Sequence, residues 1–194
     1  MELNPLTALS PIDGRYARQT DALRDIFSEC AFMNARVRVE VEWLISLSEA
    51  GFAELPHLSD HGKAFLRGLA DNFSLADCEA IKEIEKTTNH DVKAVEYWIK
   101  NQVAHDEELK SASEFVHFSC TSEDINNTSH AIMLKRGREA LADYLQQIHD
   151  TIAGFAHQWA EIPMLSRTHG QTASPTTVGK EFANVAVRDR KSVV

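Results

Sequence analysis

The sequence predicts an all-α protein, and three observations lead to this prediction. Apolar residues recur at three- and four-residue steps over most of the chain. Serine, threonine, aspartate or asparagine stands directly before several of these runs, as helix N-caps do. No stretch shows the strict apolar and polar alternation of a half-buried strand. We therefore expect helices joined by short loops.

The first helix is expected after an irregular segment, residues 1–19, in which Pro11 and Gly14 break any periodicity. From Thr20 onward the apolar residues follow the helical step, and Gly51 is the stop signal of this run. The apolar stripe comprises Leu23, Phe27, Cys30, Val37, Val41, Leu44 and Leu47. We expect one amphipathic helix here.

Shorter helices are expected in the middle of the chain. Ser74 and Asp77 have the spacing of a capping box, which opens a helix at this point. Asn89 is the expected N-cap of the helix that follows. The expected spans are residues 59–71, 74–86, 89 to about 103, and 107–118.

A much longer helix is expected next. Thr121 and Asp124 again have capping-box spacing, and no proline occurs from there to residue 160. About 40 residues at about 1.5 Å rise would span about 60 Å. A single small domain cannot cover so long a helix, so it indicates a large bundle or an oligomer core.

The last part of the chain is expected to return to helix after a loop. Pro163 ends the long helix, and residues 163–174 have the composition of a loop. Ser174 is the expected N-cap of a final helix, with Pro175 at its first position. We expect two structural parts: residues 1–110 as an N-terminal all-α domain, and residues 111–194 as the first part of a central helical bundle.

Composition excludes several classes of function. The 194 residues carry 20 basic and 29 acidic side chains, a net charge of −9, which argues against a nucleic-acid binder. No apolar run is long enough to span a membrane. There is no P-loop, GxGxxG or HExxH motif, so we expect neither metal nor cofactor. Cys30, Cys78 and Cys120 suggest no disulfide framework or zinc site, and favour a reducing, cytoplasmic location.

Two polar clusters stand at expected helix starts, where unpaired N–H groups and the helix dipole favour an anion. One is residues 87–91, with Asn89, His90 and Asp91. The other is residues 117–124, in which Thr121 and Ser122 could hydrogen-bond a carboxylate or phosphate. For each cluster the plainer interpretation is a helix cap, with His117 as a satisfied core histidine.

Two further clusters lie in expected loops. His169 stands beside Gly170 and is flanked by hydroxyls and an arginine, which suits proton transfer, although a surface loop histidine would look the same. Near the N-terminus, Arg15 and Tyr16 place a cation next to a phenol in a turn. Taken alone, that pair is more simply a surface turn.

Together these clusters resemble the adenylosuccinate lyase family, in its longer bacterial form. The resemblance runs from residue 10 to about residue 188 and rests on four segments in order: SPIDGRY, TTNHDVKAVEY, HFSCTSEDINN and LSRTHGQ. The family belongs to the fumarase/aspartase superfamily, whose core is a bundle of very long helices. The resemblance therefore implies that fold, a homotetramer and a small nucleotide substrate, without nucleic acid, membrane or cofactor.

The implied reaction is a β-elimination with C–N cleavage. Fumarate leaves adenylosuccinate to give AMP, and a succinyl carboxamide ribotide reacts in the same way in purine biosynthesis. By motif, His169 matches the general acid. The substrate-binding positions match Arg15, Tyr16, Asn89, His90, Asp91, Thr121 and Ser122.

Two departures from the family pattern stand out. Thr172 occupies the position that is commonly proline after HGQ. The family's mobile loop, whose serine is the general base, has no counterpart in these residues, so we expect the 194 residues alone to be inactive. Two alternatives stay open: an inert helical interaction module on the same scaffold, and another superfamily lyase, such as argininosuccinate lyase or fumarase.

Overall fold

The computed structural model describes residues 6–52 and 54–190. Helices dominate these residues, which confirms the all-α prediction with one exception, a two-stranded hairpin. Residue contacts divide the chain into a first unit, Met1–Gly137, and a second unit, Arg138–Val194. The boundary falls inside α7 (Ser122–Gln158), the long helix that the sequence predicts.

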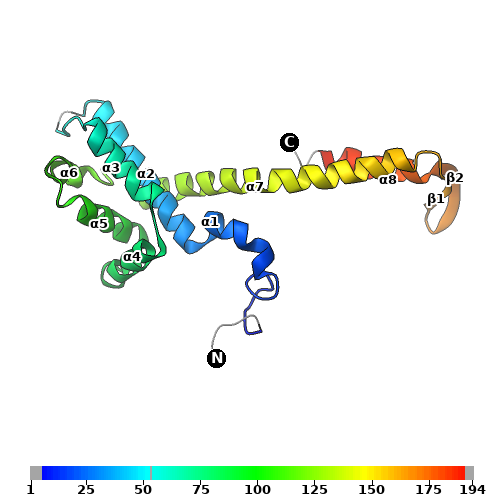
Figure 1. Cartoon of the computed structure of the whole chain (residues 1–194), viewed down its shortest axis with the longest axis horizontal. Helices are drawn as coiled ribbons and strands as arrows, with labels where there is room; N and C mark the ends of the chain where they lie inside the picture. Colours follow the sequence, from blue (N-terminus) through cyan, green and yellow to red (C-terminus); the bar gives the residue numbers. More distant parts are fainter. Residues whose placement is uncertain (1–5, 53, 191–194) are drawn as a thin grey trace. The chain divides into compact units, whose positions relative to one another are not determined.

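The first unit is built around α2 (Glu29–Glu49). This helix packs against α3 (Asp60–Asp71), α4 (Leu75–Thr88) and α5 (Asp91–Val103), as Figure 1 shows. The shared core includes Val37, Val41, Leu44, Leu66, Ile81, Val95, Ile99 and Leu109, all almost fully buried. The apolar stripe predicted for the first long helix therefore faces the core of this unit over α2.

The expected single helix from Thr20 is wrong at its start. The chain instead forms a 3-10 helix η1 (Ala17–Leu23) and a short α1 (Arg24–Phe27), and α2 begins only at Glu29. Ser28 has an extended backbone, and its hydroxyl accepts a hydrogen bond from the backbone N–H of Ala31 at 3.2 Å. Ser28 is therefore an N-cap that divides the predicted helix, although the apolar periodicity continues across it. Residues 1–5 of the expected irregular segment lie outside the described residues.

The capping box predicted from Ser74 and Asp77 is confirmed at the start of α4. Ser59, the first residue of the expected span 59–71, is the N-cap of α3. The expectation that Asn89 caps α5 is wrong: Asn89 ends α4 in the left-handed conformation, φ +50°, and His90 is the N-cap of α5. Asparagine is common at helix N-caps and also at left-handed helix ends, because its short polar side chain tolerates the left-handed region.

The predicted helix over residues 107–118 ends early. It consists of α6 (Glu107–Ala112) and a 3-10 turn, η2 (Ser113–Phe115). The backbone then turns through His117 and Ser119, which both have positive φ, before α7 begins. A segment with two left-handed residues cannot continue as a helix.

The expectation of no disulfide is also wrong in this structure, because Cys30 and Cys78 are joined. Cys30 lies in α2 and Cys78 in α4, and the packing of these helices brings together two cysteines that are 48 residues apart in the sequence. Cys120 is the free cysteine, and burial raises the pKa of its thiol to about 11.

In the second unit, the expected loop over residues 163–174 is a β-hairpin. Strands β1 (Pro163–Thr168) and β2 (Gln171–Thr177) pair antiparallel, with a register shift between Leu165 and Arg167. His169 and Gly170 form the two-residue turn, both at positive φ, as the favoured hairpin turns require. Both strands are largely exposed, so no apolar alternation marks them in the sequence.

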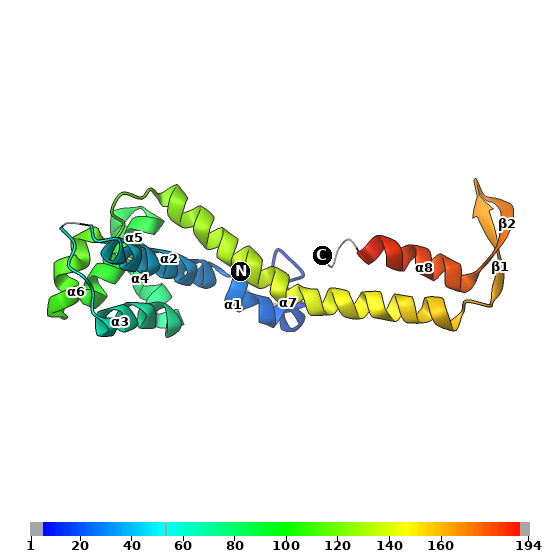
Figure 2. The same ribbon diagram turned by 90° about the horizontal axis from the view of Figure 1, so that it is seen from above.

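The final helix α8 (Val178–Asp189) begins three residues later than expected. Ser174 and Pro175 lie in β2, and Thr177 is the N-cap, accepting a hydrogen bond from Lys180 N–H at 3.1 Å. Figure 2 shows α8 running beside the end of α7. Gly179 makes this approach possible, because a Cβ there would collide with the backbone of Ala156 and Ala160.

Candidate functional site

The starts of α5 and α7 meet in the first unit. His90, the N-cap of α5, accepts a hydrogen bond at Nδ1 from the backbone N–H of Lys93, at 3.2 Å. Its other ring nitrogen, Nε2, lies 3.4 Å from the hydroxyl of Ser122, the first residue of α7. Two clusters that are 32 residues apart in the sequence therefore form one site, where two helix N-termini carry partial positive charge.

Thr121 performs the capping that its spacing to Asp124 predicts. Its backbone N–H and its hydroxyl both donate to Asp124 Oδ2 at 2.8 Å. These hydrogen bonds lower the pKa of the Asp124 carboxyl, so it stays charged at the positive end of α7. The Thr121 hydroxyl is thus engaged within the chain, whereas the Ser122 hydroxyl faces His90.

Asp91 is held by the protein itself. Its Oδ2 forms an ion pair with Arg36 Nη2 at 2.6 Å, and its Oδ1 accepts from the backbone N–H of Val92 at 2.9 Å. Partial burial disfavours the charged carboxylate, but the Val92 N–H and the Arg36 guanidinium outweigh it and lower the pKa of Asp91. Asn89, His90, Asp91 and Arg36 line part of a cavity of about 430 Å³.

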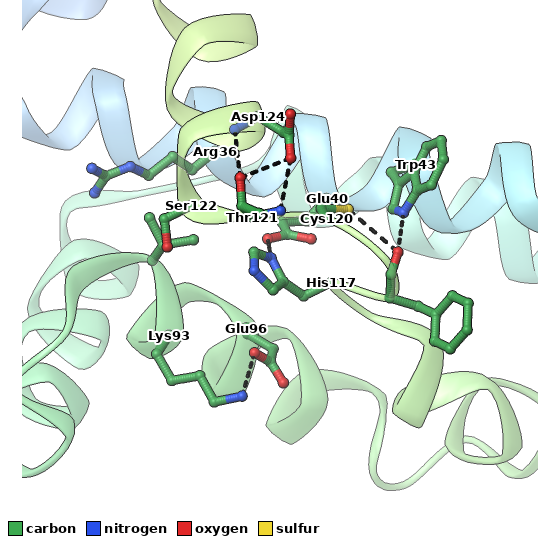
Figure 3. A network of polar contacts seen from close by, with 12 residues as sticks. Arg36, Glu40, Trp43, Lys93, Glu96, His117, Cys120, Thr121, Ser122 and Asp124 are labelled. Carbon is green, nitrogen blue, oxygen red and sulfur yellow. Dashed lines mark hydrogen bonds and ion pairs between the residues drawn. The ribbon is translucent and has the colours of Figure 1, made fainter.

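A buried polar group that sequence reasoning missed lies on α2, behind this site. Glu40 is completely buried, and its Oε1 lies 2.6 Å from His117 Nδ1 (Figure 3). The hydrogen bond that His117 donates to the Glu40 carboxylate raises the pKa of His117, although burial opposes the charged imidazole. One turn along α2, the indole N–H of Trp43 donates to the carbonyl of Phe118 at 2.8 Å. These two contacts fix the turn that leads into α7.

Glu96 on α5 is a second buried carboxylate in this region. Its oxygens pair with Lys93 at 2.7 Å and with Lys100 at 3.3 Å. Lys93, whose backbone N–H is capped by His90, therefore already has a carboxylate partner for its side chain. Positive charge for a ligand would come from the helix starts.

Arg15 and Tyr16 are not brought to the contact between His90 and Ser122. They lie in the turn before η1, where the Arg15 guanidinium stands over the Tyr16 ring at 4.8 Å from its centroid. Figures 1 and 2 both show this segment beyond α1, away from the start of α7. Their predicted role in substrate binding stays a prediction.

His169 lies in the second unit, at the tip of the hairpin, and it is exposed. The turn holds its backbone at φ +51°, with Gly170 at φ +75°. A histidine in this conformation is uncommon outside turns, and here it presents the ring to solvent. Its predicted role as general acid stays a prediction.

Two other features bear on the class of protein. The described residues contain no group of three or more histidine, cysteine or acidic side chains placed to bind a metal ion. Among the same residues, none of the helices combines the length and apolar character that crossing a bilayer requires.

The sequence matches the lyase family over residues 14–192. The chain belongs to this family. Among its relatives, the adenylosuccinate lyase of Vibrio cholerae serotype O1 is 54% identical over 190 residues, and that of Escherichia coli strain K12 is 53% identical over 190. Each alignment covers 97% of this chain but only 42% of the relative. The resemblance found in the four sequence segments is confirmed.

Two solved structures have the same fold over most of this chain. A fumarate lyase from Mesorhizobium sp. BNC1 superposes with a TM-score of 0.71 at 19% identity, over 89% of this chain and 38% of that one. A 3-carboxy-cis,cis-muconate lactonizing enzyme from Pseudomonas putida gives a TM-score of 0.67 at 22% identity, over the same shares of the two chains. At this identity the likeness establishes the fold alone.

Proposed function

We propose that this chain carries the substrate-binding part of an adenylosuccinate lyase, which releases fumarate from adenylosuccinate to give AMP. The same chemistry would act on a succinyl carboxamide ribotide in purine biosynthesis. The observation that carries the proposal is the contact between His90 and Ser122 at two helix starts. The names of relatives that are 53–54% identical support it.

The substrate would suit such a site because it is strongly anionic, with two carboxylates and a phosphate. The partial positive charge at the starts of α5 and α7 would attract such groups. Ser122 would donate its hydroxyl hydrogen, and His90, whose Nδ1 accepts from Lys93, would donate from Nε2. We assign the remaining substrate contacts to Arg15, Tyr16, Asn89, Asp91 and Thr121.

His169 would act on the leaving group. Elimination requires a base that takes the Cβ proton beside a carboxylate, and an acid that protonates the departing nitrogen. His169, exposed at the hairpin tip, is the proposed acid. We further propose a cytoplasmic homotetramer in which residues 1–110 form the N-terminal domain and residues 111–194 begin the central bundle.

The test is fumarate release, followed by ultraviolet absorbance in the full-length lyase that contains these residues. His169→Ala should lower kcat by about 10²- to 10⁴-fold, the usual contribution of general acid catalysis, while KM changes little. His157→Ala, on the exposed end of α7, is the matched control and should keep the parent rate. A His169→Ala enzyme within about threefold of the parent would remove the assignment.

A further inference from the structure

A buried arginine connects the two helix starts. Arg36 lies on α2, and its side chain is only 6% exposed. Its Nη2 donates to Asp91 Oδ2 at 2.6 Å, and its Nε donates to Asn126 Oδ1 at 2.9 Å. The guanidinium also lies over the Phe32 ring, 3.9 Å from its centroid. One side chain thus contacts the first turn of α5 and the first turns of α7.

The partners of Arg36 are next to the residues that form the site. Asp91 directly follows His90, and Asn126 lies four residues after Ser122, which places it one turn further along α7. The planar guanidinium has donors in fixed directions, so it sets the distance and the orientation between its two partners. Lysine, which carries a point charge on a flexible stem, cannot do this.

Arg36 also holds the carboxylate beside His90. The Nδ1 atom of His90 lies 3.7 Å from Asp91 Oδ1. Arg36 pairs with the other oxygen of the same carboxylate, so Asp91 lies between the guanidinium and the imidazole.

We propose that Arg36 is a positioning residue that holds His90 and Ser122 against one ligand, by fixing Asp91 and Asn126. This rests on the proposed function for the identity of the ligand, but not for the geometry. The Nε and Nη2 donors of Arg36 are directed at these two side chains, so the role assigned to it is positioning.

The same helix offers a matched control. Arg38 lies two residues further along α2 and also forms an ion pair with an aspartate, Asp71, at 2.8 Å. That pair is exposed, with 39% of the Arg38 side chain and 59% of the Asp71 side chain accessible. Exposed pairs contribute little to stability, so Arg38→Met removes an arginine from α2 with little other consequence.

The experiment compares Arg36→Met, Arg36→Lys and Arg38→Met in the 194-residue chain. The first readout needs no ligand: the NMR chemical shifts of the His90 ring and of the Ser122 amide. We expect both to move in Arg36→Met and in Arg36→Lys, because both variants lose the fork that fixes Asp91 and Asn126. Both should stay at the parent's values in Arg38→Met.

The second readout is the dissociation constant for adenylosuccinate. Arg36→Met and Arg36→Lys should both weaken binding by about tenfold or more, because both lose the fork that fixes Asn126. Asn126→Ala should weaken binding while leaving the His90 ring shifts unchanged, because Asp91 keeps its pair with Arg36. If Arg36→Met does not fold, Arg36→Lys and Asn126→Ala decide the outcome.

Two results would overturn the proposal. One is a folded Arg36→Met chain with the parent's chemical shifts and affinity. The other is an Arg36→Lys chain, or an Asn126→Ala chain, that binds as tightly as the parent. If the parent chain bound no adenylosuccinate, the proposed function would be contradicted, whereas the shifts measured without ligand would still test the role of Arg36.

Discussion

The two units of this chain differ in how far they are stabilised by buried contacts of their own. In the first unit, α2, α3, α4 and α5 enclose an apolar core, and the candidate site is built against it. In the second unit, Gly179 and Ala186 are the buried residues among those described. Several of its large apolar side chains are exposed: Leu141, Tyr144, Ile148, Ile162, Leu165, Val185 and Val187. The second unit is therefore stabilised far less by its own contacts.

This difference extends to the candidate site residues. His90 and Ser122 are placed by caps, an ion pair and buried polar groups from three helices. His169 is placed by one hairpin turn. The proposed binding residues are therefore held by many contacts within the first unit, whereas the proposed general acid has little local support.

The largest test of the comparison is a matched pair of leucines. Leu44 on α2 is 1% exposed, whereas Leu141 on α7 is 43% exposed. Leu44→Ala should lower the free energy of unfolding by about 2–5 kcal/mol, because it removes buried surface and leaves a cavity. Leu141→Ala should stay within about 0.5 kcal/mol of the parent in urea denaturation. Equal costs would mean that the two units are supported alike.

A second test uses two glycines of α7. A Cβ at Gly137 would collide with the Phe27 ring of α1, whereas nothing lies within 4 Å of a Cβ at Gly154. We expect Gly137→Ala to destabilise the chain by about 1–2 kcal/mol, through forced movement of α1. Gly154→Ala should stabilise α7 by about 0.5–1 kcal/mol, because alanine favours helix. Melting temperatures that shift in the same direction would contradict the packing of α1 on α7.

The smallest effect concerns pH. Glu40 raises the pKa of His117 in the folded chain, so the pair contributes its full stabilisation of the fold when the pH is below the pKa of histidine in the unfolded chain, about 6.5. This contribution is lost as the pH rises through the higher pKa of His117 in the folded chain. Compared with His117→Gln, the parent should lose stability across that window, as measured by denaturation at several pH values. His61→Gln, at an exposed histidine, should show the same dependence of stability on pH as the parent. If His117→Gln also shows the parent's dependence, the stabilising pair of Glu40 and His117 is refuted.

Local rules predicted most of the helices. Ser74 with Asp77 marks the start of α4, and Thr121 with Asp124 marks the start of α7. These features depend on residues three or four positions apart, which a sequence displays directly. The hairpin was missed because both of its strands are largely exposed, so no buried face imposes alternation.

The support of the candidate site could not be predicted in this way. Arg36 and Glu40 interrupt the apolar stripe of α2 and look like solvent-facing residues until their partners are known. Those partners, Asp91, His117 and Asn126, lie 55 to 90 residues away in the sequence. The joining of Cys30 and Cys78 depends on helix packing in the same way.

The central claim is that the starts of α5 and α7 form one site for the anionic groups of adenylosuccinate. The most direct measurement is an NMR titration of the 194-residue chain with this compound, followed at the backbone amides. We predict saturable shifts that are largest at residues 89–93 and 121–124, and that vanish together in Ser122→Ala. Shifts confined to other residues, or no saturable shift in these two segments, would contradict the account.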